Sequence, residues 1–458
     1  MPMPATATLI ENGWLFTGES EVSAIAPLAI AGGRIAATGD AALAWAAQRN
    51  DVSRIDATGM TVMPGLIDAH CHISFDEPHS NDELFFHRRE GLAAIVAGYN
   101  AKKLLRAGVT SIFDADTIFS VSLDLRDAIE GGVVEGPRML CGGNALITSV
   151  GGTAGLLVPD EGGVGYLRVT RSRDEIVAEI RNQAKRGVDW IKIHVTGLIP
   201  RQRAEGEIQV WNLAELELAA QTAHDLGLPI VGHCRNASST RDAARAGFDM
   251  ILHATYMDEE ALEAVVKAKV PIVPTLTFQA VLAEHGHNVG ASGFLQTLFA
   301  AEIEGSSKQL RRAWDAGVPL LCGSESGFSI TPYGEWHWRE LQIMVENIGL
   351  TPAQALLSAT REGARALGRH GELGVLAPGN PADVVVVRGD ATQDVTVLGQ
   401  PGAIEHVFAG GRAVDLVTPL PPRRPLPSWR VSTYSGVPAT RAAVADLPNT
   451  GNAEGGAP

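Results

Sequence analysis

The chain lacks the features that would associate it with a membrane or a nucleic acid. Its 458 residues include 37 lysines and arginines against 52 aspartates and glutamates, which gives a net charge of −15. This charge repels phosphate backbones and anionic lipids, so we expect neither nucleic acid nor membrane as a partner. No apolar run approaches the ~20 residues that cross a bilayer. The start of the chain also lacks a basic stretch followed by an apolar core.

Cysteine and aromatic residues are scarce as well. The four cysteines lie far apart without a C-x-x-C pair, which excludes a disulfide scaffold and a thiolate zinc module. Phe, Trp and Tyr together make up only 5% of the chain. We expect a globular cytoplasmic protein that acts on a small molecule, and we expect it to form a homo-oligomer.

Glycine, by contrast, is abundant, with 50 residues, and several glycines mark a repeated joint between a helix and a strand. At each joint an amphipathic stretch ends at a glycine, which adopts the left-handed conformation at low cost, and an apolar run follows directly. The joints lie at Gly108, Gly187, Gly227, Gly247 and Gly317. Repetition of helix, glycine and buried strand predicts parallel strands joined by crossovers.

Eight such strands are expected between residues 59 and 370. Clear helical patterns separate most of them, for example over residues 174–186, 213–226 and 258–269. The count predicts an α/β protein with a (β/α)8 TIM barrel, and a doubly wound parallel sheet is the alternative. The predicted strands start near Thr61, Ser111, Arg138, Trp190, Pro229, Met250, Pro271 and Val318.

The segments that flank this region have a different character. Residues 1–58 and 371–418 carry short β-like runs between glycine turns. We predict that they form one small composite β-sandwich domain beside the barrel at 59–370. Residues 419–458 begin with a Pro-rich arm that would lie on this subunit or a neighbour, and the Gly/Ala/Asn tail at 440–458 is expected to be disordered.

Chemically active side chains recur where the predicted strands end, as they do in barrel enzymes. His70 and His72 lie on one face of the first strand and can share a metal ion, although a single His-x-His is more often two ordinary polar residues. His233 and His253 end the fifth and sixth strands, and Glu325 follows the eighth. Each is weak evidence alone, but their recurrence at the same end of the barrel indicates a common site.

Lys192 lies inside the apolar run of the fourth strand, where a bare ammonium is costly to bury. A salt bridge to a carboxylate would explain it. The functional interpretation is that burial lowers its pKa, so that the neutral amine reacts with carbon dioxide and the resulting carbamate bridges two metal ions.

These residues stand in segments that resemble the metal-dependent amidohydrolase superfamily, from about residue 8 to residue 415. The most specific match is Pro-Gly-Leu-Ile-Asp-Ala-His-Cys-His at 64–72, and Leu-Ala-Pro-Gly-Asn-Pro-Ala-Asp at 376–383 matches the return to the small β domain. Within the superfamily the chain resembles the imidazolonepropionase and Xaa-Pro dipeptidase branch. It is most similar there to the subgroup of molinate hydrolase and phenylurea hydrolase.

The resemblance implies a set of metal ligands. His70 and His72 would bind one divalent ion, His233 and His253 a second, and carbamylated Lys192 would bridge the two. One or two ions per subunit are expected, and zinc, cobalt and manganese all suit these ligands.

Three positions depart from the family pattern. Glu325 stands where the family has Asp, which keeps a general base but leaves open whether it also ligates the metal. Gly151-Gly152-Thr153 replaces a Gly-Gly-His, and His233-Cys234-Arg235 replaces a His-x-His. The two lost histidines weaken an assignment as a dipeptidase.

The substrate pocket is predicted from aromatic and cationic residues in the loops. The aromatics Phe75, Phe278, Phe328, Tyr333, Trp336 and Trp338 would suit a neutral aromatic or cyclic amide, although packing between barrel and loops explains them equally well. Arg201, Arg203 and Arg235 are candidates for binding a carboxylate, or they are structural. The predicted substrate contacts are Phe75, Thr153, Arg201, Arg235, Phe328, Tyr333, Trp336 and His337.

The function implied by these parts is hydrolysis of a non-peptide C–N bond in an amide, urea or thiocarbamate, for example a xenobiotic such as a herbicide. A metal-bound hydroxide would attack the carbonyl, and Glu325 would pass the proton to the departing amine. One alternative is an Xaa-Pro dipeptidase. A deaminase is disfavoured by Lys192. A non-catalytic metal-binding barrel is suggested by Glu325 but opposed by the five intact ligand positions.

Overall fold

The computed structural model describes residues 7–78, 84, 89–152, 160, 165–197, 207–289 and 293–423. The chain divides into two compact units, residues 1–418 and residues 419–458. All helices and strands within the described residues belong to the first unit. No helix among them is long and apolar enough to span a bilayer.

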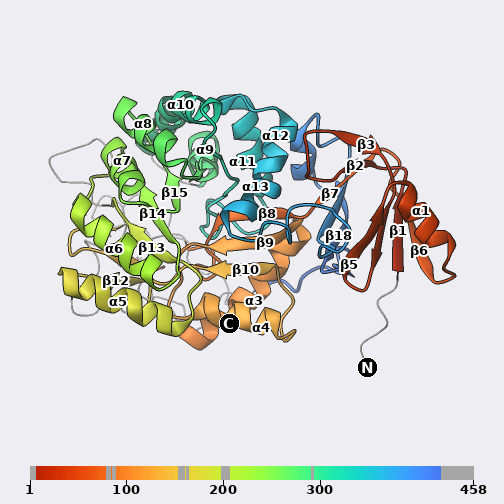
Figure 1. Cartoon of the computed structure of the whole chain (residues 1–458), viewed down its shortest axis with the longest axis horizontal. Helices are drawn as coiled ribbons and strands as arrows, with labels where there is room; N and C mark the ends of the chain where they lie inside the picture. The colour runs from red at the N-terminus through yellow and green to blue at the C-terminus, as the bar shows by residue number, and fades with distance from the viewer. Residues whose placement is uncertain are drawn as a thin grey trace, which may run out of the picture. The chain divides into compact units, whose positions relative to one another are not determined.

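Strands from both ends of the chain build two neighbouring sheets (Figure 1). These strands are β1 Ala7–Glu11, β2 Trp14–Phe16, β3 Ser23–Ile25, β4 Leu28–Ala31, β5 Arg34–Thr38, β6 Val52–Asp56, β7 Met60–Pro64, β17 Val384–Arg388, β18 Ile404–Ala409 and β19 Arg412–Ala413. One sheet has the order β5-β4-β1-β6 and the other β19-β18-β17-β7-β2-β3. Ile30 of the first sheet and Val62 and Val384 of the second belong to one buried apolar cluster.

The strand predicted to start near Thr61 proves to be two strands with different partners. β7 pairs antiparallel with β17, with Val62 opposite Val386. β8 (Leu66–Cys71) pairs instead with β9 (Val109–Asp114). A Cβ atom at Gly65, between the two strands, would lie 2.0 Å from Thr110 Oγ1, so the close passage beside β9 requires glycine. The prediction that the first parallel strand starts near Thr61 is therefore wrong, because one continuous apolar run hides the change of sheet.

The parallel strands form two sheets that are linked to each other at their edges. The other parallel strands are β10 Arg138–Cys141, β11 Ala145–Ile147, β12 Leu167–Val169, β13 Ile191–His194, β14 Ile230–Cys234, β15 Met250–His253 and β16 Ile272–Val273. The sheet orders are β10-β9-β8 and β12-β11-β13-β14-β15-β16. Trp190 N donates to Cys141 O at 3.2 Å on one side. On the other side, residues 320–322 connect β16 to β8, since Leu321 N donates to Ile272 O at 2.9 Å and Ala69 N to Cys322 O at 2.8 Å.

The strand predicted near Val318 is not regular. Leu320 makes an isolated bridge to Ile272, and Ser326 makes another to Cys71. The segment therefore contacts its neighbours through isolated bridges and single hydrogen bonds rather than through a regular ladder.

Helices alternate with the parallel strands, and Figure 1 shows α6, α7 and α8 on the outer side of β13–β15. The helices are α1 Asp40–Ala47, α3 Glu90–Arg106, α4 Val121–Glu130, α5 Arg173–Arg186, α6 Leu213–Asp225, α7 Ala237–Arg245, α8 Glu259–Ala268, α9 Thr277–His285, α10 Gly293–Asp315, α11 His337–Ile343, α12 Pro352–Ser358 and α13 Arg361–Ala366, with shorter turns η1 Gly286–Val289, η2 Met344–Ile348 and η3 Val395–Gly399. The three helices predicted from periodicity match α5, α6 and α8 to within one residue at each end. Gly187 ends α5 with φ 83°, the left-handed conformation expected at the joints.

Candidate active site

Four of the predicted ligand histidines meet where the parallel strands end. The ring centroid of His70 lies 4.9 Å from that of His72 and 5.3 Å from that of His253. The His253 ring in turn lies 4.5 Å from the His233 ring. All four side chains are buried. The structure thus brings together the ends of β8, β14 and β15, as the sequence predicts.

The segment that carries Glu325 lies directly against His70 and His72. Cβ atoms at Gly323 and Gly327 would fall 2.8 Å from His70 Cβ and 2.9 Å from His72 Cβ, so larger residues would displace the histidines. Glu325 N donates to His70 O at 2.7 Å, and Glu325 adopts a left-handed φ of 54°. One ligand atom from each of His70, His72 and Glu325 lies within 4.8 Å of the others. The Glu325 carboxylate therefore reaches the histidine pair despite its extra methylene.

The electrostatic environment keeps most of these imidazoles neutral. Burial lowers the pKa of His70 and His253, and it lowers the pKa of His233 to about 4. Burial also lowers the pKa of His72, but the carboxylate of Asp116 outweighs it and the net change is a rise. Neutral imidazole is the form that binds metal ions.

Two ring nitrogens of the cluster face each other at hydrogen-bonding distance. His253 Nε2 and His233 Nδ1 lie 3.0 Å apart, near the roughly 3.4 Å between two ligands of one tetrahedral zinc ion with bonds of about 2.1 Å. His70 Nδ1 contacts Thr275 Oγ1 at 3.0 Å, which leaves its Nε2 for a ligand. The donor set of neutral imidazoles and one carboxylate fits zinc, cobalt or manganese.

The pKa of the Glu325 carboxyl group is shifted upward, toward neutrality. Burial raises its pKa to about 7, although the nearby charges of His72, Arg235 and Lys192 act in the opposite direction. A carboxylate with a pKa near neutrality exchanges protons readily at physiological pH.

Asp116, after β9, lies in the histidine cluster although the sequence analysis did not single it out. Its Oδ1 lies 2.7 Å from His72 Nδ1, and its Oδ2 lies 2.9 Å from His194 Nε2 and 3.7 Å from Lys192 Nζ. Burial favours protonation of Asp116, but Lys192 and the two histidines outweigh it and hold its pKa well below the usual range. The signal was present as Asp114-Ala115-Asp116 at the end of the second strand, spaced like the His-x-His of the first.

Lys192 is fully enclosed in β13 next to Asp116. Its side chain is only 1% exposed. Burial lowers its pKa, with Asp116 and Glu325 acting in the opposite direction. Both predicted interpretations, an ion pair and a neutral amine, are compatible with this environment.

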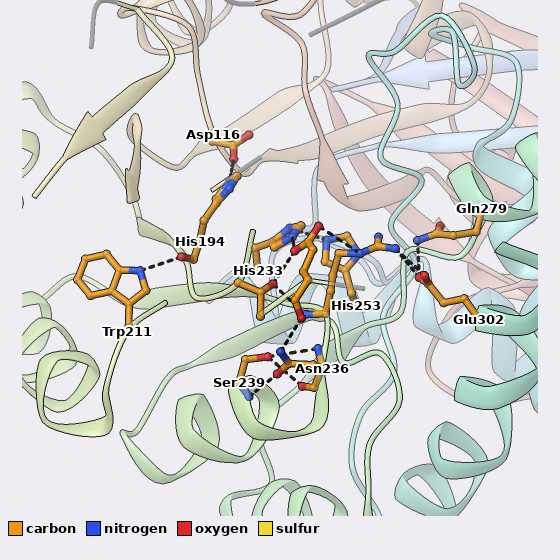
Figure 2. A network of polar contacts seen from close by, with 12 residues as sticks. Asp116, His194, Trp211, His233, Asn236, Ser239, His253, Gln279 and Glu302 are labelled. Carbon is orange, nitrogen blue, oxygen red and sulfur yellow. Dashed lines mark hydrogen bonds and ion pairs between the residues drawn. The ribbon is translucent and has the colours of Figure 1, made fainter. Parts of the chain in front are cut away.

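A second group of carboxylates surrounds the His233 side of the site (Figure 2). Glu207 Oε2 lies 2.9 Å from His233 Nε2, and His233 together with Arg235 lowers the Glu207 pKa to about 2 despite the opposing effect of burial. Arg235 donates to Glu302 of α10 at 2.6 Å. The predicted carboxylate-binding arginine is thus already paired within the protein. Nothing in the sequence near Arg235 identifies Glu302, which lies 67 residues away.

The predicted aromatic contacts fall into two groups. Phe75 stacks on His72 with a centroid distance of 4.2 Å, and Phe328 contacts both Phe75 and Phe278 edge to face at 5.3 and 5.4 Å. These three lie beside the histidines. Trp336 instead contacts Trp338 and His285, so its assignment as a substrate contact is not supported by its surroundings.

Tyr333 and His337 are buried and fully engaged within the protein. Tyr333 donates its hydroxyl to His72 O at 2.6 Å and accepts from Asp76 N at 3.0 Å. His337 Nδ1 lies 2.7 Å from Asp68 Oδ2, and its Nε2 accepts from Gly334 N at 3.1 Å. The structure thus shows these residues supporting the His72 backbone and Asp68, and their role as substrate contacts stays a prediction. Thr153, Arg201 and Arg203 lie outside the described residues.

A cavity of about 340 Å³ opens elsewhere, between the first residues of β8 and β10 and the C-terminal strands. Its Arg138 and Asp383 pair with each other at 3.0 Å. Because the imidazoles and Glu325 lie at the opposite ends of the strands, we assign the chemistry to the carboxyl ends.

Residues 61–414 match the Amidohydrolase family. The chain belongs to this family. This result places the cluster of histidines in a family of hydrolases and confirms the resemblance predicted from Pro64–His72.

Several characterised proteins are similar to the chain over most of its length. Ochratoxinase of Aspergillus niger is 26% identical, with 89% of this chain and 86% of that protein covered. The crystal structure of an Xaa-Pro dipeptidase with bound methionine shares 27% identity, with a TM-score of 0.76 and coverage of 89% and 99%. Molinate hydrolase, at 24% identity with a TM-score of 0.74 and coverage of 93% and 99%, shares the fold. Imidazolonepropionases and phenylurea hydrolase B are also among the similar proteins.

Proposed function

We propose that this protein is a metal-dependent hydrolase that cleaves a non-peptide C–N bond in a small amide, urea or thiocarbamate. The observation that carries the proposal is the convergence of His70, His72 and Glu325 to within 4.8 Å, beside the facing nitrogens of His233 and His253. Membership of the amidohydrolase family supports it.

The architecture that we propose for this activity is a closed (β/α)8 barrel beside a composite β-sandwich domain. The backbone hydrogen bonds from Cys141 to Trp190 and from residues 320–322 to both neighbours support closure. The pairing of β7 with β17 supports a sandwich built from residues 7–64 and 376–413, with the barrel beginning at Leu66. Closure matters because it gathers the strand ends into one site.

We propose that His70 and His72 hold one divalent ion and that His233 and His253 hold a second, with a carbamate on Lys192 as the bridge. The neutral Lys192 amine would form a bond to the carbon of carbon dioxide and release one proton. Burial, which lowers the Lys192 pKa, supports this reaction. Asp116, 2.7 Å from His72 Nδ1, would orient the ring so that its Nε2 faces the ion.

The chain's own residues would then position the substrate and move the proton. A divalent ion held by these histidines supplies Lewis acidity that polarises the carbonyl and acidifies water. The Glu325 carboxylate would accept the proton of the attacking water and donate it to the departing amine nitrogen. Phe75, which is buried beside the histidines and contacts Phe328, would help to keep bulk water away from the polarised carbonyl.

An Xaa-Pro dipeptidase is the second candidate function. The 27% identity to a dipeptidase structure favours it, whereas the pairing of Arg235 with Glu302 removes a cation that could hold the substrate carboxylate. A non-catalytic metal-binding protein is disfavoured by the reach of Glu325 to the histidine pair.

The decisive experiment measures metal content and activity together. We expect wild-type protein prepared with bicarbonate to bind two ions, and Lys192→Ala to bind one or none; an unchanged count would contradict the bridge. Turnover of an anilide and urea panel against an Xaa-Pro dipeptide panel then separates the two enzymes. Complete inactivity of the metal-replete protein on every acyl substrate would support the non-catalytic alternative.

A further inference from the structure

Arg235 follows β14 two residues after His233, and its guanidinium is enclosed by carboxylates of the same chain. Its Nη2 donates to both carboxylate oxygens of Glu302, at 2.6 and 2.7 Å. Its Nε lies 3.6 Å from Glu207 Oε1. Only 14% of the Arg235 side chain is exposed. One positive charge therefore already faces two carboxylates before a substrate enters.

Glu302 is held in place by a second partner on the neighbouring helix. Gln279 of α9 donates from Nε2 to Glu302 Oε1 at 3.1 Å, and Figure 2 shows both side chains turned toward each other. Each Glu302 oxygen thus accepts a hydrogen bond, as an ionised carboxylate does. Burial raises the Glu302 pKa, and the charge of Arg235 opposes that rise. Only 6% of the Glu302 side chain is exposed, so the pair is shielded from solvent.

An aromatic wall connects this pair to the histidines. The guanidinium carbon of Arg235 lies 5.9 Å from the ring centroid of Phe299, which contacts Phe278 at 6.1 Å. Phe278 contacts Phe328, which contacts Phe75, and Phe75 stacks on His72. A series of aromatic contacts therefore runs from Arg235 to His72, alongside the polar link through Glu207 to His233. Such an aromatic wall suits an uncharged substrate group.

We propose that Glu302 is a specificity-determining residue: by occupying Arg235 it restricts the site to substrates that are uncharged beyond the scissile bond. Such substrates are apolar or aromatic amides, ureas and carbamates whose non-reacting part lies along Phe278 and Phe328. This inference rests on the proposed function, because it names the substrate class of the same site.

The charge balance explains why Glu302 selects against anions. Glu207 and Glu302 together outnumber the single charge of Arg235, so a substrate carboxylate would be the third anion around one cation. It would also lose its hydration in the aromatic surroundings, and the cation that contacts Glu207 and Glu302 among the described residues, Arg235, is already paired. An uncharged amide at the same position meets neither cost.

The test compares two isosteric ligands, 4-acetamidobenzoate and 4-acetamidobenzamide, which differ by one charge. Calorimetry on the metal-loaded wild type should show tighter binding of the carboxamide. Glu302→Gln keeps an oxygen that can accept the hydrogen bond of Gln279 but removes the negative charge that occupies the Arg235 guanidinium. The ratio of carboxylate to carboxamide affinity should then rise roughly 10–100-fold, as expected for a charge-assisted hydrogen bond. If the compounds are hydrolysed, the change should appear in KM rather than in kcat.

Glu304→Gln is the matched control, because Glu304 is an exposed residue on the same helix; it should leave the ratio unchanged. A wild type that binds the carboxylate more tightly would overturn the proposal, and this measurement does not depend on whether the variant folds. A folded Glu302→Gln protein with an unchanged ratio would also overturn it.

The outcomes distinguish this inference from the proposed function. Hydrolysis of neutral amides with no change of the affinity ratio would reject the role of Glu302 alone. Absence of any hydrolysis, with the ratio shifted as expected, would reject the proposed function while the binding preference remained.

Discussion

The two halves of the site are organised differently. On the β8 side, His70, His72 and Glu325 come together through backbone contacts: Glu325 N bonds to His70 O, and Gly323 and Gly327 lie against the histidines. On the side of β14 and β15, side chains make the contacts: the Glu207 carboxylate contacts His233, and Arg235 pairs with Glu302.

We propose that the two halves differ in their tasks: the β8 half holds the ion that supports the reaction, and the side-chain network around His233 and Arg235 tunes which substrate binds. Backbone contacts leave the side chains that they position little freedom to move. This suits metal ligands, whose distances to the ion must be correct within a few tenths of an ångström. A side-chain network changes by single substitutions, as suits a surface that chooses between substrates. We therefore expect the β8 half to carry most of the activity and the other half to tune it.

The largest effect should come from removing a β8 ligand. His70→Ala takes one imidazole from the close group with His72 and Glu325, so we expect loss of the ion that supports the reaction and a fall in kcat/KM of roughly 10⁴-fold. His253→Ala should retain one ion per chain and more activity. Metal analysis and kinetics on both variants check this. Equal losses in the two variants would show that the halves are not separable.

The next effect concerns proton transfer rather than metal binding. Glu325→Gln keeps the size of the side chain but removes the base, so we expect kcat to fall roughly 10³-fold while metal content is kept. Glu325→Asp, which restores the residue of the family pattern, is the matched comparison and should retain more turnover. Loss of the metal in Glu325→Gln would show instead that Glu325 acts mainly as a ligand.

The two halves of the site also differ in how well the sequence predicts them. The two histidines of the β8 half could be predicted because both sit in one motif, Pro64–His72, and strand alternation places them on one face. The pairing of Arg235 with Glu302 could not be predicted. The sequence does not distinguish Glu302 from Glu304 on the same helix, and only the tertiary structure shows that Glu302 is buried. The separation of β7 from β8 was also missed, because both strands are apolar and just one residue, Gly65, lies between them.

A smaller effect is expected from Asp116, which links the halves through His72 and His194. Asp116→Asn keeps the shape but loses the charge that orients His72, so metal affinity should fall roughly 10–100-fold. Competition with a chelator measures this, and Asp124→Asn on the exposed face of α4 serves as the control. An unchanged affinity would mean that the backbone alone holds His72 in position.

The smallest effect is expected from an exposed ion pair. It tests whether Glu302 affects ligand preference because it is buried, and not merely because it forms an ion pair. α10 also carries Arg312, which pairs with Glu259 of α8 at 2.5 Å on the surface. Hydrogen bonds from Arg312 and Gln309 lower the Glu259 pKa to about 2. Because this folded-state pKa is depressed, any stabilisation is present above the unfolded pKa of about 4.5 and is lost as pH falls toward 2.

Solvent and salt screen the exposed Glu259–Arg312 pair, so Glu259→Gln should leave the thermal unfolding midpoint at pH 7 unchanged within error, and the ligand preference as well. Thermal scans at pH 3 and pH 7, at low and high salt, measure this. A loss of stability at pH 7 as large as that of Glu302→Gln would contradict the argument, because the exposed carboxylate of α8 and the buried carboxylate of α10 would then contribute alike.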